Sequence, residues 1–120
     1  IKMMNDKKWT PFINFKEYSS HDPQKPDVLD LQVANPELCG TRYSTNARVY
    51  HKDSDGSWNE RILPVKNHDS KNFSLFEQWE KDFHKGLITV NTHIRIKFWM
   101  DKSKRNSDRF IRRFKLIVLD

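Results

Sequence analysis

Alternating apolar and polar residues predict that most of this chain forms β-strands. The strands are expected at residues 28–33, 46–53, 57–65, 92–100 and 109–119. The second and third strands flank Ser54-Asp55-Gly56, and the Asp-Gly pair suits a tight hairpin turn with positive φ. Pro64 has no N–H for a sheet hydrogen bond, so we expect it at a strand end or a sheet edge.

One segment, residues 74–86, instead shows a helical pattern. Its apolar residues recur on one helical face, at Phe76, Trp79 and Phe83. Ser74 and Glu77 match the Ser-x-x-Glu capping box that begins many helices. Gly86 suits a left-handed C-terminal cap, with Leu87 making the apolar contact that follows it. We therefore expect a single amphipathic helix that plugs the core.

The last two strands each combine an apolar face with a basic one. In the first of them, the residues expected on the solvent face are His93, Arg95, Lys97 and Trp99. In the second, the apolar face contains Phe110, Phe114, Leu116 and Val118. Arg112 falls on that apolar face as well, so we expect a bulge near Arg112 or exposure of that end of the strand.

Positive charge is concentrated near the C-terminus, although the net charge of the whole chain is only +6. Residues 1–60 carry eight basic and nine acidic side chains, whereas residues 61–120 carry fourteen basic and seven acidic ones. Within residues 93–115, nine Lys and Arg side chains face only two acids, Asp101 and Asp108. Such a localised field suits a polyanion, which can be nucleic acid, an anionic membrane or an acidic protein.

Several classes of function lack their sequence signals. No apolar run approaches the length of a transmembrane span, and the first residues lack the apolar core of a signal peptide, so this chain reads as a piece of a longer polypeptide. Cys39 is the single cysteine, which excludes an internal disulfide and favours a reduced, intracellular compartment. The five histidines show no zinc-binding spacing, and three glycines are too few for a phosphate-binding loop. We therefore expect no catalytic residues, metal, cofactor, small-molecule substrate or membrane partner.

The predicted order of three strands, a helix and two strands matches the OB-fold, a five-stranded Greek-key barrel. On this interpretation residues 28–120 form the barrel domain, and residues 1–27 form an N-terminal extension that packs on it as a strand. The extension has apolar anchors at Trp9, Phe12, Ile13, Phe15 and Tyr18. OB-folds bind oligonucleotides through the loop between their last two strands, among other elements, and here that loop is the basic segment 101–108.

Residues 86–97 resemble the passage from the helix to the fourth strand in OB domains, and Trp9-Thr10-Pro11 is similar to their lead-in. The closest class is that of telomere end-binding, protection-of-telomeres domains. This resemblance implies a nuclear protein that binds single-stranded, often G-rich DNA in a groove, alongside other subunits of a nuclear complex.

A second resemblance covers only the C-terminal part of the chain. Gln78-Trp79-Glu80, Trp99 and residues 109–117 are similar to the DNA-binding domain of yeast glycolytic-gene activators. This resemblance implies recognition of duplex DNA and requires helices where alternation predicts strands. A third hypothesis is a protein-interaction module, whose basic strip meets an acidic partner.

Binding of single-stranded nucleic acid, with DNA favoured over RNA, is the leading hypothesis. Cations contact phosphates and flat side chains stack on bases, each stack being worth about 1–3 kcal/mol. The predicted nucleic-acid-binding residues are Arg95, Lys97, Trp99, Lys102, Lys104, Arg105, Arg113, Tyr50, Trp58 and His93.

Overall fold

The computed structural model describes residues 10–69, 72–105 and 108–119. In this part of the chain, five antiparallel strands form one open sheet, accompanied by a 3-10 turn and one α-helix. The elements are η1 (Phe15–Glu17), β1 (Asp27–Gly40), β2 (Ser44–Lys52), β3 (Trp58–Asn67), α2 (Ser74–His84), β4 (His93–Lys102) and β5 (Phe110–Val118). The predicted mainly β class, with a helix between the third and fourth strands, is confirmed. No helix within the described residues is long and apolar enough to span a membrane.

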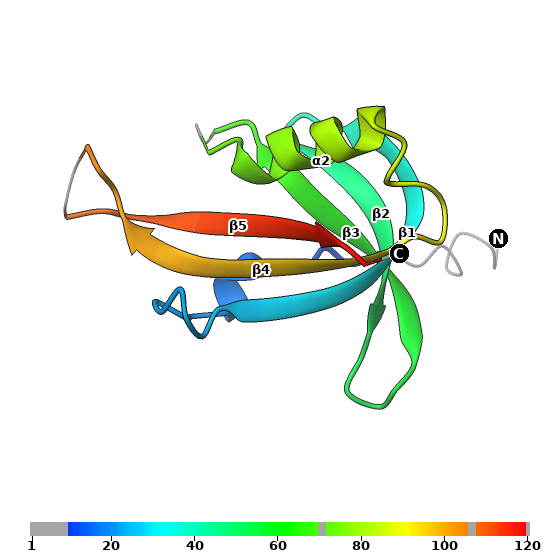
Figure 1. Cartoon of the computed structure of the whole chain (residues 1–120), viewed down its shortest axis with the longest axis horizontal. Helices are drawn as coiled ribbons and strands as arrows, with labels where there is room; N and C mark the ends of the chain where they lie inside the picture. The colour runs from blue at the N-terminus through cyan, green and yellow to red at the C-terminus, as the bar shows by residue number, and fades with distance from the viewer. Residues whose placement is uncertain (1–9, 70–71, 106–107, 120) are drawn as a thin grey trace, which may run out of the picture.

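The strands lie in the order β3-β2-β1-β4-β5. Strands β1, β2 and β3 follow one another through hairpins, and the chain then returns through α2 to place β4 on the other side of β1. Strand β1 bends beside α2 (Figure 1), where its register with β2 shifts on either side of Asn35. Our prediction ended this strand at residue 33, which is wrong. The irregular pairing after Asn35 tolerates Pro36, which has no N–H to donate.

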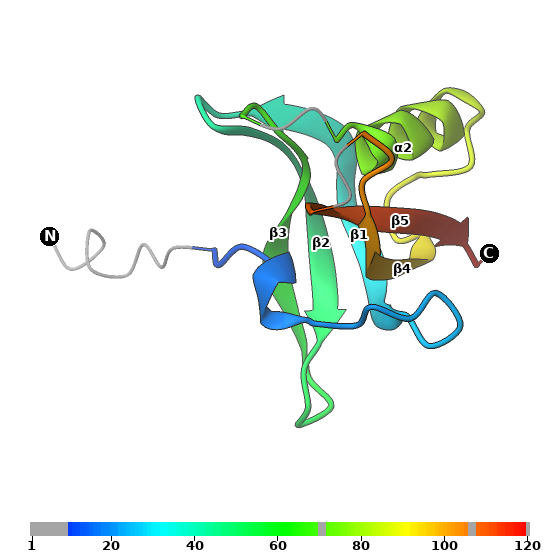
Figure 2. The same ribbon diagram turned by 90° about the vertical axis from the view of Figure 1, so that its left-hand side faces the viewer.

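The core lies inside the curled sheet and is closed by α2. Its fully buried side chains come from every strand except β5, together with the helix and the connection that follows it; the largest are Trp79, Phe98, Leu29, Leu31, Leu63, Leu75, Ile88, Ile94 and Ile96. Helix α2 packs against β5, as Figure 2 shows, and also contacts β3; these are the two edge strands of the sheet. The buried Trp79 ring also donates an Nε1–H hydrogen bond of 3.0 Å to the carbonyl of Pro36. The helix therefore plugs the space that the sheet leaves open.

The two glycines expected in special conformations adopt them. Gly56 has φ +88° in the β2–β3 turn, and Gly86 has φ +75° after the helix. The amide of Gly86 bonds the carbonyl of Phe83, and the amide of Leu87 bonds the carbonyl of Asp82, which together form a Schellman motif. The predicted capping box is wrong, because the helix already includes Ser74, whose hydroxyl accepts a hydrogen bond from the Gln78 side chain.

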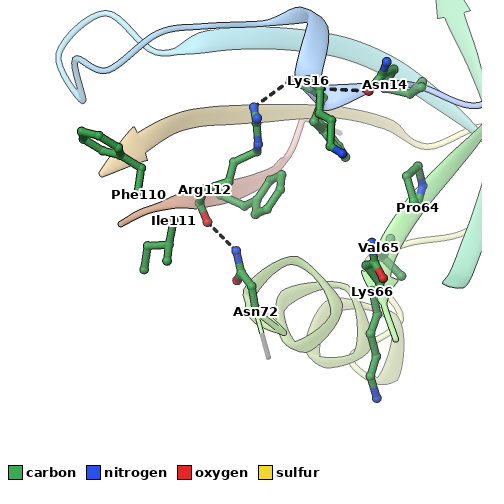
Figure 3. A pocket seen from close by; sticks show the side chains of 13 residues that line it. Asn14, Lys16, Pro64, Val65, Lys66, Asn72, Phe110, Ile111 and Arg112 are labelled. Atoms are coloured by element: carbon green, nitrogen blue, oxygen red, sulfur yellow. Dashed lines mark hydrogen bonds between the residues drawn. The ribbon is translucent and has the colours of Figure 1, made fainter. Parts of the chain in front are cut away.

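The conflict at Arg112 is resolved without a bulge. The described register between β4 and β5 is continuous, so Arg112 lies on the inner face, as its position in the alternation predicts. Its guanidinium donates a 2.8 Å hydrogen bond to the carbonyl of Phe15 (Figure 3). The same group lies 5.8 Å from the centre of the Phe98 ring. The N-terminal segment thus supplies the acceptor that makes an inward-facing arginine tolerable.

The N-terminal segment reaches this position by following β3. The amide of Ile13 bonds the carbonyl of Ile62, and the amide of Ile62 bonds the carbonyl of Pro11. Phe15 and Tyr18 then pack edge-on against Phe98, with ring centroids 5.0 and 5.1 Å away. The predicted N-terminal strand is therefore wrong: a single bridge and the 3-10 turn η1 take its place. The predicted anchor Trp9 lies outside the described residues.

Candidate functional site

A groove of about 920 Å³ lies beside the loop that joins β4 to β5. Its basic lining comes from that loop and the start of β5, namely Lys104, Arg105, Arg109 and Arg113. The other lining residues are Asp69, Asn72, Phe73, Ser103, Phe110 and Ile111. Because Asp69 is the one acid among these lining residues, the groove has a positive field suited to an anion. We call this site the basic groove.

Two connections of the fold line the basic groove, the β4–β5 loop and the segment between β3 and α2. The β4–β5 loop is closed at its base by a 2.8 Å bond from the amide of Ser103 to the carbonyl of Arg109. The β1–β2 loop is tied to the segment after β3, since the amide of His68 bonds the carbonyl of Tyr43 at 2.9 Å. His68 precedes Asp69, which lines the groove. The β1–β2 loop is therefore bonded to a segment that leads into the groove, whereas the β4–β5 loop, which projects toward the viewer in Figure 2, lines the groove directly.

Two exposed aromatic rings lie in the wall of the basic groove. Phe73, just before α2, is 36% exposed, and Phe110, at the start of β5, is 48% exposed. The His21 ring packs edge-to-face against Phe110, with the ring centroids 4.9 Å apart and an interplanar angle of 89°. The groove thus combines guanidinium and ammonium groups, which bind phosphates, with flat faces on which bases can stack.

The outer face of β4 and β5 continues the charged surface beyond the groove. Arg113 lines the groove and pairs in register with Trp99, while Lys97 pairs with Lys115. The Arg113 guanidinium lies 3.5 Å from the Asp101 carboxylate, a loose and exposed pair that leaves its other N–H groups accessible. Arg113 is therefore the residue that joins the groove to the sheet face.

Arg95 is more firmly engaged within the protein than the sequence suggested. Its Nε lies 2.7 Å from Asp30 Oδ1, across the β1–β4 pair. The hydrogen bond to Asp30, and the charge of that carboxylate, raise the pKa of Arg95 above its usual value. Because Asp30 compensates its charge, Arg95 contributes less to an anion site than Lys97 does.

The predicted aromatic residues of the hairpin lie at the opposite end of β4. The rings of Trp58 and His93 have centroids 6.3 Å apart, and Tyr50 and His93 both pair in register with Gln32. The span from His93 to Lys102 covers about 30 Å of extended chain. The structure therefore brings Tyr50, Trp58 and His93 together, but far from the basic groove.

The predicted site residues thus divide into two groups. Lys104, Arg105 and Arg113 line the basic groove, and Lys102 is exposed at the strand end beside it. Trp99 and Lys97 lie on the adjoining sheet face and are partly buried. Our set of predicted contacts missed the groove residues Arg109, Phe73, Phe110, Asn72 and Asp69. Arg109 belongs to the basic run, which was a usable signal, whereas the positions of Phe73 and Asn72 depend on how the loops fold.

Other chemistry finds little support in this part of the chain. Among the described residues, no cluster of three His, Cys, Asp or Glu side chains is arranged to hold a metal ion. Asp53 lies in a structural network, since its carboxylate accepts hydrogen bonds from Asn59 and Arg61. Strands occupy residues 93–102 and 110–118, where the resemblance to yeast activators requires helices.

Comparison of the chain with protein-family models, with curated proteins and with solved structures gave no significant match.

Proposed function

We propose that this chain is a non-enzymatic OB-type domain that binds single-stranded nucleic acid in the basic groove. The observation that carries the proposal is the composition of that groove, where Lys104, Arg105, Arg109 and Arg113 lie beside the exposed rings of Phe73 and Phe110. Phosphates and unpaired bases require these two kinds of side chain together.

The topology supports the OB assignment. Strands β1 to β4 lie in the spatial order 4-1-2-3, with the long return connection through α2, which is the order expected if they form the Greek key of an OB-fold. OB-folds bind oligonucleotides with the loops after their first and fourth strands. Here the loop after β4 lines the basic groove, and the loop after β1 is bonded to His68, which precedes the groove residue Asp69. The position of the groove therefore agrees with the fold that we propose.

Single strands are favoured over duplexes because the aromatic rings need an exposed base face. In a duplex the base faces are stacked on one another, so Phe73 and Phe110 have nothing to bind except the backbone. The resemblance to telomere end-binding domains further favours DNA over RNA and a nuclear location. Other subunits of a nuclear complex are then additional partners.

Binding assays at two salt concentrations test this proposal. The triple variant Lys104→Gln, Arg105→Gln, Arg109→Gln is compared with a control that loses the same charge elsewhere, Lys25→Gln, Lys81→Gln, Lys85→Gln. We expect the groove variant to bind a single-stranded oligonucleotide about 100-fold more weakly at low salt, and its log–log salt slope to fall by about 2. The control should change affinity by less than about threefold, because its side chains lie outside the groove.

The panel of ligands discriminates between the alternatives. Single-stranded DNA should bind more tightly than duplex DNA, with RNA of the same sequence as the third ligand. Equal weakening by both triple variants would show that net charge, and not the groove, causes binding. If no nucleic acid binds even at low salt, a protein-interaction module becomes the better interpretation.

A further inference from the structure

A pocket of about 410 Å³ opens between the two edge strands of the sheet, next to the basic groove (Figure 3). One wall comes from β3 and the other from β5, while the segment around η1 and residue Asn72 close its ends. Its apolar lining consists of Ile13, Phe15, Pro64, Val65, Phe110, Ile111 and Phe114. Its volume and mainly apolar walls are typical of a site for a small flat group.

We call this space between β3 and β5 the seam pocket, and its polar side chains mainly offer hydrogen-bond donors. Lys16 extends from the N-terminal segment into the space between the strands (Figure 3). Asn14 and Asn67 use their carbonyl oxygens to accept backbone hydrogen bonds, from the amides of Lys16 and Asp69. In each case the NH₂ group keeps two donors, for which the described residues show no partner.

The other two cations of the lining are directed elsewhere. Arg112 donates to the carbonyl of Phe15. The Lys66 ammonium lies 4.6 Å from the Phe73 ring centroid and 4.9 Å from that of Phe76, on the side of α2. The seam pocket therefore offers an ammonium from Lys16 and amide donors, between apolar walls.

The seam pocket and the basic groove adjoin each other. Asn72, Phe110 and Ile111 line both of them. A strand whose phosphates lie along Lys104, Arg105 and Arg109 thus passes the mouth of the pocket, where the ring of Phe110 lies. Of the parts of such a strand, only the base is flat, largely apolar on its faces and polar at its edge.

We propose that one base of the bound strand turns out of the basic groove and enters the seam pocket, and that the pocket selects G or T there. This inference rests on the proposed function. G and T present carbonyl oxygens, O6 and O4, where A and C present amino donors. If the pocket's donors meet the major-groove edge of the base, they are matched by O6 of G or O4 of T, whereas the amino group that A or C presents there would face another donor.

The test uses the shortest oligo(dT) that binds the intact chain with full affinity. Each position in turn is replaced by an abasic site, and separately by C. We expect one position at which the abasic site weakens binding about tenfold and replacement by C about fivefold, because stacking and edge hydrogen bonds are lost there. Other positions should show smaller and similar effects.

Variants at the pocket identify where this base binds. Lys16→Trp fills the pocket from the N-terminal side, and Asn67→Trp fills it from β3. Both side chains are exposed, so the variants should keep the far-ultraviolet circular dichroism of the parent chain. In both variants, no position of the oligonucleotide should remain more sensitive than the others to an abasic site or to C. The salt slope should stay within about 1 of the parent value. Lys16→Gln, the matched control, should keep the abasic effect and lose about half of the discrimination against C.

The outcomes separate the two proposals. An oligonucleotide that binds with the expected salt slope but shows no sensitive position overturns the seam pocket and leaves the basic groove standing. A sensitive position that persists in Lys16→Trp and Asn67→Trp also overturns it, because the base then binds elsewhere. Absence of any binding by the parent chain overturns both.

Discussion

Each face of the β4–β5 hairpin carries an arginine and an aromatic residue, but the inner pair belongs to the core and the outer pair faces solvent. On the inner face, the Arg112 guanidinium lies over the Phe98 ring, at 5.8 Å from its centre. On the outer face, Arg113 pairs in register with Trp99 and lines the basic groove. In both strands the inner and the outer residue are sequence neighbours, so a one-residue change of register would exchange their surroundings.

What separates the two arginines is whether the protein itself satisfies them. Burial lowers the pKa of Arg112 despite the opposing charge of Asp27, and the carbonyl of Phe15 accepts one of its N–H groups. Among the described residues, the ion-pair partner of Arg113 is Asp101, in a loose contact at 3.5 Å. A basic residue counts toward a binding surface only when its donors remain available, and charge along the sequence does not report this.

The largest effect should come from truncating the aromatic pair. Phe98→Ala removes a fully buried ring that contacts Phe15, Tyr18 and Phe114, and we expect it to lower the free energy of unfolding by about 3–5 kcal/mol. Trp99→Ala should cost about 1–2 kcal/mol, because a partly exposed ring leaves no closed cavity. Urea denaturation followed by circular dichroism measures both values.

The same pair of variants tests the direction in which β4 faces. An equal loss of stability in Phe98→Ala and Trp99→Ala would mean that both rings belong to the core. The outer face would then lose its best stacking candidate, and the binding surface would be restricted to the basic groove.

An intermediate effect is expected from the arginine pair. Arg112→Leu removes the bond to Phe15 and the contact with the Phe98 ring, which should lower stability by about 2 kcal/mol and leave the salt slope of oligonucleotide binding unchanged. Arg113→Leu should leave stability within about 0.5 kcal/mol, weaken binding about tenfold and reduce the salt slope by about 0.7. A binding assay and a denaturation curve on each variant suffice. Reversed results would place Arg112, and not Arg113, against the ligand.

Alternation along the chain predicted every strand because each strand buries one face only. It also placed Arg112 on the inner face, yet it offered no reason for an arginine there. The reason is the carbonyl of Phe15, which is 97 residues away in the sequence. The continuation of β1 past residue 33 was missed for a similar reason. Pro36 normally indicates the end of a strand because it has no N–H to donate, but the irregular pairing in this part of β1 does not require one.

The candidate site was less predictable than the fold. Charge clustering found Lys104, Arg105 and Arg113, because loops between strands are exposed wherever they occur. The alternation of β5 placed Phe110 inside, but that end of the strand extends past the core, and the ring is 48% exposed. The sequence analysis also assigned Tyr50 and Trp58 to the same binding site as Trp99, because residues can be assigned to a face without knowing how far apart they lie along it.

The smallest effect concerns pH and belongs to the inner face alone. Burial, followed by the charges of Glu17 and Asp27, raises the pKa of Tyr18, whose ordinary value is 10.0. A raised pKa means that the folded state holds the phenolic proton more tightly than the unfolded state does. This contribution to stability is complete below pH 10.0 and is lost as the pH rises through the pKa of the folded state.

Tyr18→Phe has no proton to lose, so it should lose less stability than the parent chain between about pH 9 and about pH 11. Thermal denaturation across that range, with each chain referred to its own value at neutral pH, measures the difference. Parallel curves for the two chains would show that the Tyr18 hydroxyl is in water, and that the N-terminal segment does not close the inner face in solution.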